Sequence, residues 1–99
     1  MTSEIYRISE NAAFESFDDG GLILKLEDLT LTELNLTARD ILHHTDGKND
    51  VNRVAELIAA EYGIDNALAA SDIRELYDDL LAQGILEKLT DGEKEPDHD

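Results

Sequence analysis

The spacing of the apolar residues changes twice along this chain, and the change near residue 35 constrains the fold most. Before it, apolar and polar residues alternate in short segments, which predicts β-strands with one buried face. The three expected strands are residues 13–17, 22–26 and 30–34. Residues 18–21 read Asp-Asp-Gly-Gly, and glycine there supplies the positive φ angles that a tight hairpin favours. Asp28 suits the second turn, so the sequence predicts a three-stranded antiparallel meander.

After residue 35 the apolar residues recur at spacings of three and four, which is typical of amphipathic helices. The expected helices are a short one that Asn35 or Thr37 caps and that ends at residues 46–47, a second over residues 51–62, and a third over residues 68–83. Asp50 suits the cap of the second helix, and Gly63 and Gly84 suit the ends of the second and third. Ile85 and Leu86 are then expected to fold back onto the core. The predicted fold is α+β and winged-helix-like, a three-stranded antiparallel β-meander followed by three helices.

The second change comes near residue 90. Residues 90–99 contain five acidic residues and one lysine with nothing apolar to bury, which predicts a disordered acidic tail after one domain over residues 1–89. The chain has no cysteine, which excludes disulfides and thiolate metal sites and is consistent with a reducing compartment. The N-terminus lacks the pattern of a signal peptide and no apolar run is long enough to span a bilayer, so we expect a cytoplasmic protein.

The formal net charge of −16 argues against two classes of partner. Nucleic acids and anionic membranes attract lysine and arginine, so neither is expected to bind this chain. The third helix would be the DNA-reading helix of a winged-helix protein, and Arg74 is its only cation against four acidic residues. An acidic winged-helix regulator of transcription therefore stays as the alternative function.

The sequence contains no convincing set of catalytic or metal-binding residues. His43 and His44 are neighbours on a helix and point in different directions, so the two cannot share one metal ion. Asp78 and Asp79 are also neighbours on a helix, so their carboxylates do not face each other as a catalytic pair would. They fit the solvated face of the third helix instead. We therefore predict no catalytic residue, no metal and no cofactor; a small enzyme would need a titratable cleft that the sequence does not show.

Several short motifs occur in an order that resembles the PqqD family. Residues 34–42 read Leu-Asn-Leu-Thr-Ala-Arg-Asp-Ile-Leu, an Asp-Gly pair follows at 46–47, and Gly-Ile-Leu at 84–86 follows the last helix. The resemblance extends over about residues 6–89. It implies a non-catalytic chaperone that captures the leader of a ribosomally made precursor peptide and presents it to a modifying enzyme, often a radical S-adenosylmethionine protein. Members that serve pyrroloquinoline quinone synthesis usually have an aromatic-Pro-Glu-Gly turn where residues 25–29 read Lys-Leu-Glu-Asp-Leu, which favours a different peptide product.

The resemblance also implies where a leader binds. In the family the leader adds as a strand beside the third strand, in a cleft that the last helix closes. The matching residues here are Thr30, Leu31, Thr32, Glu33 and Leu34 on the strand, and Ile73, Arg74, Tyr77 and Leu81 on the helix. Tyr77 and Arg74 are expected at the rim of the cleft, whereas Ile73, Leu76 and Leu80 are expected to be first of all core residues. The residues themselves support strand addition, since the edge of a small sheet is a template for an extended peptide, although two copies of the chain could also pair there.

Overall fold

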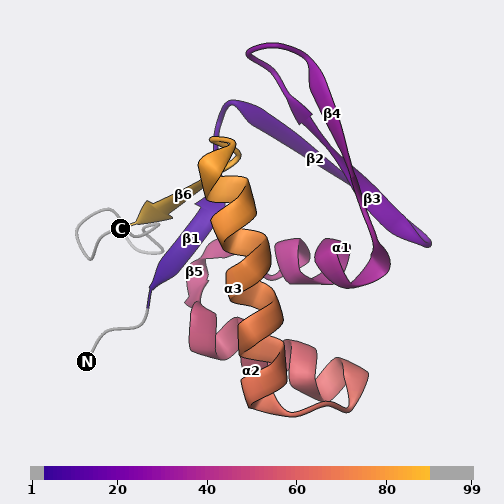
Figure 1. Cartoon of the computed structure of the whole chain (residues 1–99), viewed down its shortest axis with the longest axis vertical. Coiled ribbons are helices and arrows are strands. Elements are labelled where there is room, and N and C mark those ends of the chain that lie inside the picture. The colour runs from indigo at the N-terminus through magenta and orange to yellow at the C-terminus, as the bar shows by residue number, and fades with distance from the viewer. Residues whose placement is uncertain (1–3, 90–99) are drawn as a thin grey trace, which may run out of the picture.

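The structure is a computed structural model and describes residues 4–89 (Figure 1). In chain order the elements are β1 (Ile5–Ile8), β2 (Ala12–Phe17), β3 (Gly20–Lys25), β4 (Thr30–Leu34), α1 (Leu36–His43), β5 (Asp46–Asp50), α2 (Val51–Tyr62), α3 (Asn66–Ala82) and β6 (Leu86–Leu89). The predicted α+β class, with a β2–β3–β4 meander ahead of the helices, is confirmed. The tail predicted over residues 90–99 lies outside the described residues.

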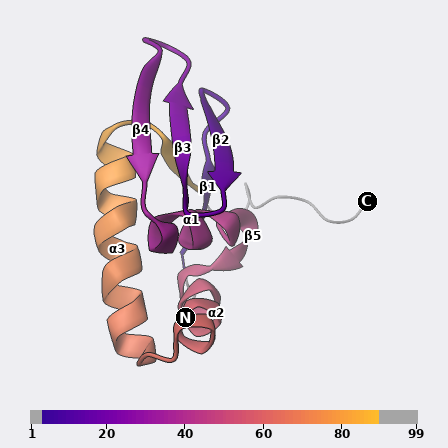
Figure 2. The same ribbon diagram turned by 90° about the vertical axis from the view of Figure 1, so that its right-hand side faces the viewer.

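The β2–β3–β4 meander is antiparallel throughout, and β4 forms one edge of it. Its first hairpin pairs Phe17 with Gly20, and its second pairs Lys25 with Thr30. Figure 2 shows that β4 is the strand of this sheet on the side of α3. The edge of the meander that has no strand partner therefore lies on the side of the last helix.

A second three-stranded sheet, in the order β5–β1–β6, was not expected from the sequence. Strand β5 contains no hydrophobic side chain, and it forms because its backbone pairs with β1, with Ile5 opposite Asp50. The first helix was predicted to extend to the Asp-Gly pair at residues 46–47. In the structure α1 ends at His43, because the Asp-Gly pair begins β5 and pairs with β1. Ile85 and Leu86 are buried, which confirms the expected return of the chain to the core.

The helix caps follow the sequence closely. Asn35 accepts a hydrogen bond from the Ala38 N–H at 2.8 Å and begins α1, and Asp50 does the same for the Arg53 N–H and begins α2. Gly63 ends α2 in the left-handed conformation with φ of 65°. Helix α3 begins at Asn66, slightly earlier than expected, because the backbone turns into the helix without a side-chain cap at residue 65.

The expected role of the two glycines after the first hairpin turn was wrong. Gly20 and Gly21 do not have positive φ angles; they are the first residues of β3, and Asp18 and Asp19 make the turn. Glycine is needed there for close approach. A Cβ atom on Gly21 would lie 2.7 Å from the Glu15 carbonyl oxygen, and one on Gly20 would collide with the Leu34 carbonyl.

The turn between β3 and β4 contains the one non-glycine residue with positive φ among the described residues, Leu29 at 60°. Its side chain is 69% exposed, so it gains little from packing, and the turn is held by the Thr30 N–H donating to the Asp28 carboxylate at 3.1 Å. We expect Leu29→Gly to raise the free energy of unfolding by about 0.5–1 kcal/mol, because relief of backbone strain outweighs the added flexibility. Urea unfolding of the variant and the wild type measures this change in stability. Leu26→Gly in the same turn should lower stability, and equal effects of both changes would contradict the strain.

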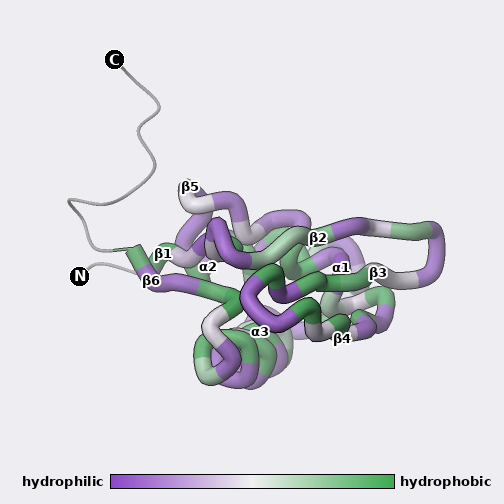
Figure 3. The backbone as a smooth tube through the Cα atoms, turned by 90° about the horizontal axis from the view of Figure 1, so that it is seen from above, coloured by the Kyte–Doolittle hydropathy of each residue, from purple (hydrophilic) through white to green (hydrophobic). Residues whose placement is uncertain are grey.

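The core lies where the three helices meet the inner faces of the two sheets. Its completely enclosed side chains are Ile23, Ile41, Leu42, Ile58, Ile73, Leu80, Ile85, Val51 and Val54. Figure 3 shows hydrophobic and hydrophilic residues alternating around α3, which buries one side in this core. Tyr6 and Tyr77 join β1 to α3 with ring centres 4.7 Å apart. Each helix therefore contributes one apolar side and leaves the opposite side available for other contacts.

A small polar network attaches α1 to its neighbours. Asp40 accepts hydrogen bonds from the Tyr62 hydroxyl at 2.6 Å and from the Arg39 guanidinium at 2.7 Å. Arg39 also donates to the Phe17 carbonyl in the first hairpin. Because α1 is fixed in this way to both α2 and the meander, its position beside β4 is well defined.

The same network predicts a pH dependence. Burial would raise the pKa of Asp40, but the hydrogen bonds from Tyr62 and Arg39 outweigh burial and hold the pKa below its ordinary value of 3.8. A lowered pKa in the folded state stabilises the fold above about pH 4, and this contribution is lost as the pH falls through the folded pKa. We expect Asp40→Asn to lower the free energy of unfolding by about 1 kcal/mol at pH 7.

The difference between Asp40→Asn and the wild type should shrink as the pH falls below about 4, as followed by urea unfolding at several pH values. Asp65→Asn is a suitable control because Asp65 is exposed and its side chain makes no cap hydrogen bond. A constant difference at every pH would show that the Asp40 charge does not contribute.

Candidate functional site

The free edge of β4 is the first component of the candidate site. One side of β4 pairs with β3 over Thr30–Leu34, and no strand among residues 4–89 pairs with its other side. The register places Thr32 opposite the fully buried Ile23, so Thr32 faces inward. Leu31 pairs with Leu24 and faces outward, where it is 62% exposed. The unpaired N–H and C=O groups of this edge can accept an extended chain.

A groove between α1 and α3 is the second component. Its volume is about 530 Å³. Its lining residues are Asn35, Thr37, Ala38, Ile41, Asp72, Glu75, Leu76 and Asp79. The apolar part of the lining is Ala38 and Ile41 from α1 and the partly buried Leu76 from α3. Asn35 directly follows β4, so the groove begins where the free strand edge ends.

The α3 wall of the groove is acidic. Asp72, Glu75 and Asp79 are three and four residues apart, so they lie on the same side of α3, with Leu76 between them. All three carboxylates are exposed. The groove therefore combines an apolar base with an acidic wall beside an open strand edge, a combination suited to binding an extended peptide.

The structure corrects the predicted positions of the α3 site residues. Ile73 and Tyr77 are buried, with 0% and 3% exposure, so the expected rim position of Tyr77 is wrong. The Tyr77 hydroxyl shares a hydrogen bond with the Thr45 hydroxyl at 2.6 Å, and burial raises the pKa of Tyr77 to about 12. Both side chains are part of the core rather than the groove.

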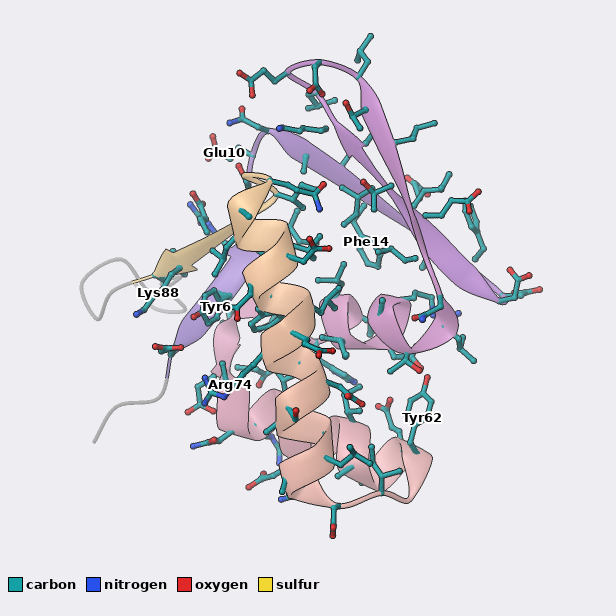
Figure 4. The ribbon with its side chains drawn as sticks, in the orientation of Figure 1. Tyr6, Glu10, Phe14, Tyr62, Arg74 and Lys88 are labelled. Carbon is teal, nitrogen blue, oxygen red and sulfur yellow. The ribbon has the colours of Figure 1, made fainter. Side chains whose placement is uncertain are left out.

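Arg74 and Leu81 are also absent from the groove lining. Figure 4 shows Arg74 on the side of α3 that faces Tyr6 and β1, while α1 lies on the other side. There Arg74 lies 3.8 Å from the Glu4 carboxylate. Leu81 is partly buried and packs against the core, as does Leu76, which in addition lines the groove.

The predicted residues on β4 lie along the free strand edge, whereas the groove is lined by other residues of α3 than the four predicted from the sequence. The missed residues on α3 are Asp72, Glu75, Leu76 and Asp79. The spacing of the apolar residues alone did not distinguish the two borders of the apolar side of α3. A signal was present in the three carboxylates at spacings of three and four around one leucine.

A second hollow, of about 260 Å³, lies on the other side of α3, between β1 and the start of α2. Two of its charged groups are paired with each other: Glu4 accepts hydrogen bonds from the Tyr6 hydroxyl at 2.8 Å and from Lys88 at 3.2 Å, and Arg74 lies 3.8 Å from its carboxylate. The hydrogen bond from Tyr6, followed by that from Lys88, lowers the pKa of Glu4. This network joins β1, β6 and α3 and has a structural role.

Within residues 4–89, no group of three or more His, Cys, Asp or Glu side chains is placed to hold a metal ion. None of the helices in that part of the chain is both long and apolar enough to cross a membrane.

Comparison with known sequences identifies the family. The sequence profile of the family described as coenzyme PQQ synthesis protein D (PqqD) matches residues 20–86, which include the β3–β4 edge and all three helices. The chain belongs to the PqqD family. Comparison with curated protein sequences gives no significant match.

Three solved structures share the fold of this PqqD-family chain. TbiB1 in complex with the TbiA(beta) leader peptide has a TM-score of 0.76 and 24% identity, covering 86% of this chain and 99% of that one. Lasso peptide synthetase B1 complexed with the leader peptide has a TM-score of 0.74 and 23% identity, covering 83% and 96%. The PqqD truncation of Methylobacterium extorquens PqqCD, a stand-alone recognition element for ribosomally synthesized and post-translationally modified peptides, has a TM-score of 0.72 and 22% identity, covering 84% and 88%.

Proposed function

We propose that this PqqD-family chain binds the leader of a ribosomally made precursor peptide as an added strand on β4. The observation that carries the proposal is the unpaired edge of Thr30–Leu34 beside the groove between α1 and α3. Two proteins of the same fold were solved with leader peptides bound, which supports a peptide as the ligand. In such binding, main-chain hydrogen bonds supply affinity and alternate side chains supply specificity.

The two faces of an added strand would meet different surroundings. Side chains on the inner face would enter the groove and approach Leu76, whereas those on the outer face would lie beside Leu31 and Glu33 of β4. Thr30, Thr32 and Leu34 would contribute mainly through their backbone and through the inner face of the sheet. The proposed contacts on α3 are those of the groove wall, in place of Ile73, Arg74, Tyr77 and Leu81.

The chain would act without catalysis or a cofactor, in the cytoplasm, and would present the bound leader to a separate modifying enzyme. A radical S-adenosylmethionine protein is one enzyme of this kind, and we propose it as the partner on the family resemblance alone. Pairing of two copies through β4 would occupy the same edge, so a homodimer of that kind would compete with the leader.

The test is an amide chemical-shift titration of the labelled chain with synthetic leader peptides from precursor genes beside its own, with a DNA duplex as the control. We expect shifts concentrated in residues 30–34 and 72–79 and none with DNA, since the α3 wall is acidic. Shifts with DNA that weaken steeply with salt would favour the transcriptional regulator instead. No shift with any leader would contradict the proposal.

A further inference from the structure

The three groove carboxylates have no counter-charge in the part of the chain that the structure describes. Five cations there form ion pairs elsewhere, with acidic partners on β6, α1 and α2 or in the segment before β1; they are Arg7, Arg39, Arg53, Arg74 and Lys88. No cation lines the groove, and within residues 4–89 the side chains of Asp72, Glu75 and Asp79 make no ion pair or hydrogen bond. The groove is therefore the place where the excess negative charge of the domain borders an apolar surface.

This arrangement is unfavourable for the free protein. Like charges three and four residues apart on one side of a helix repel each other, and Asp72, Glu75 and Asp79 have these spacings. A ligand that brings positive charge to this wall would relieve the repulsion. Partial enclosure by α1 strengthens the attraction relative to a flat surface, because the groove replaces part of the water around the charges.

The apolar residues of the groove define the second requirement. Leu76 is partly buried between the carboxylates, and Ala38 and Ile41 face it from α1. An apolar side chain of the ligand can bury its surface there without displacing the core. The groove therefore favours a ligand that carries both positive and apolar groups.

The strand edge sets the spacing of those groups. Side chains on one face of an extended peptide recur about every 6.6 Å. The seven helical steps from Asp72 to Asp79 span about 10.5 Å along α3. Two or three neighbouring side chains on the groove face of a peptide can therefore lie against the acidic wall at once.

We propose that the groove selects precursor peptides in which lysine or arginine flanks an apolar residue on one face of the added strand, in the pattern cation-x-apolar-x-cation. This inference rests on the proposed strand addition and names the chemistry of the peptide. The apolar side chain contacts Leu76, and the cations pair with Asp72, Glu75 and Asp79. The pattern follows from this chain's own α3 wall.

The test uses three synthetic ten-residue peptides that differ only in their centres. The centres are Lys-Thr-Leu-Thr-Lys, Glu-Thr-Leu-Thr-Glu and Lys-Thr-Ser-Thr-Lys, and the remaining positions are threonine. Titration of the labelled chain gives both the affinity and the location of binding. With the wild type, the first peptide should bind at least about tenfold tighter than the second, and several-fold tighter than the third.

Two protein variants separate the groove from the general negative field. Glu75→Lys reverses a charge on the groove wall, and Asp78→Lys makes the same change to an exposed residue of α3 that borders the hollow beside β1 and does not line the groove. Glu75→Lys should reduce the preference for the Lys-Leu-Lys centre over the Glu-Leu-Glu centre about fivefold or more. Asp78→Lys should change that preference by less than about twofold.

The outcomes distinguish this inference from the proposed function. Shifts along residues 30–34 with equal affinity for the lysine and glutamate peptides would overturn the charge selection and leave strand addition intact. Equal effects of Glu75→Lys and Asp78→Lys would also overturn it, because the field of the whole domain would then explain the preference. No shift in β4 with any of these peptides or with any leader would overturn both proposals.

Discussion

Replacing Ile73 by alanine is expected to lower the free energy of unfolding by about 2–5 kcal/mol. Ile73 lies in the middle of α3 with 0% exposure, and alanine would leave a cavity among side chains that are themselves enclosed. A small domain has only about 5–15 kcal/mol of stability in total, so the variant should lose a large share of it. Urea unfolding followed by circular dichroism measures the change.

Leu68→Ala is the matched control, because Leu68 lies on the same helix and is 51% exposed. We expect it to change stability by less than about 1 kcal/mol. If Ile73 faced a bound peptide at the surface instead of filling the core, the two variants would have similar and small effects. An Ile73→Ala protein as stable as the wild type would show that α3 does not pack as described.

The position of Ile73 illustrates what periodicity can and cannot predict for a helix. The spacing of apolar residues correctly identified α3 and the side that carries Ile73, Tyr77 and Leu80. It could not say that this side is covered by α2, β6 and Tyr6 of β1, because that depends on segments distant in sequence. The residues at one border, such as Leu76, then line the groove, while Arg74 at the other border pairs with Glu4.

The strands, like α3, could be predicted from the sequence where local pattern determines them and could not where pairing with a distant segment does. Strands β2, β3 and β4 were predictable because each alternates or is a short apolar run, and short turns join them. Strand β5 was not, since Asp-Gly-Lys-Asn-Asp has low strand propensity and forms its ladder only through backbone pairing with β1. Because strand binding by a peptide also depends on the backbone, the edge of β4 could be located from sequence more reliably than its side-chain contacts.

Methylating alternate amide nitrogens of a bound leader peptide is expected to have a strongly unequal effect. Along an added strand, every second N–H points toward β4, so three N-methyl groups on that set would each remove a main-chain hydrogen bond and push the backbones apart. Each lost hydrogen bond costs about 1 kcal/mol, so the affinity should fall at least about a hundredfold. Three N-methyl groups on the other set of amide nitrogens, which point away from β4, should change the affinity less than about threefold. Isothermal titration calorimetry measures both.

Similar losses from the two sets would contradict strand addition, since a helix or loop bound in the groove would not distinguish them. The sensitive set also identifies the pairing register. Hydrogen-bond direction and side-chain face both alternate with a period of two in a strand, so every residue whose N–H points toward β4 presents its side chain to the same face. If the peptide residues that prefer lysine all belong to one of the two sets, the main-chain contacts at β4 and the charge contacts at Glu75 describe a single bound strand.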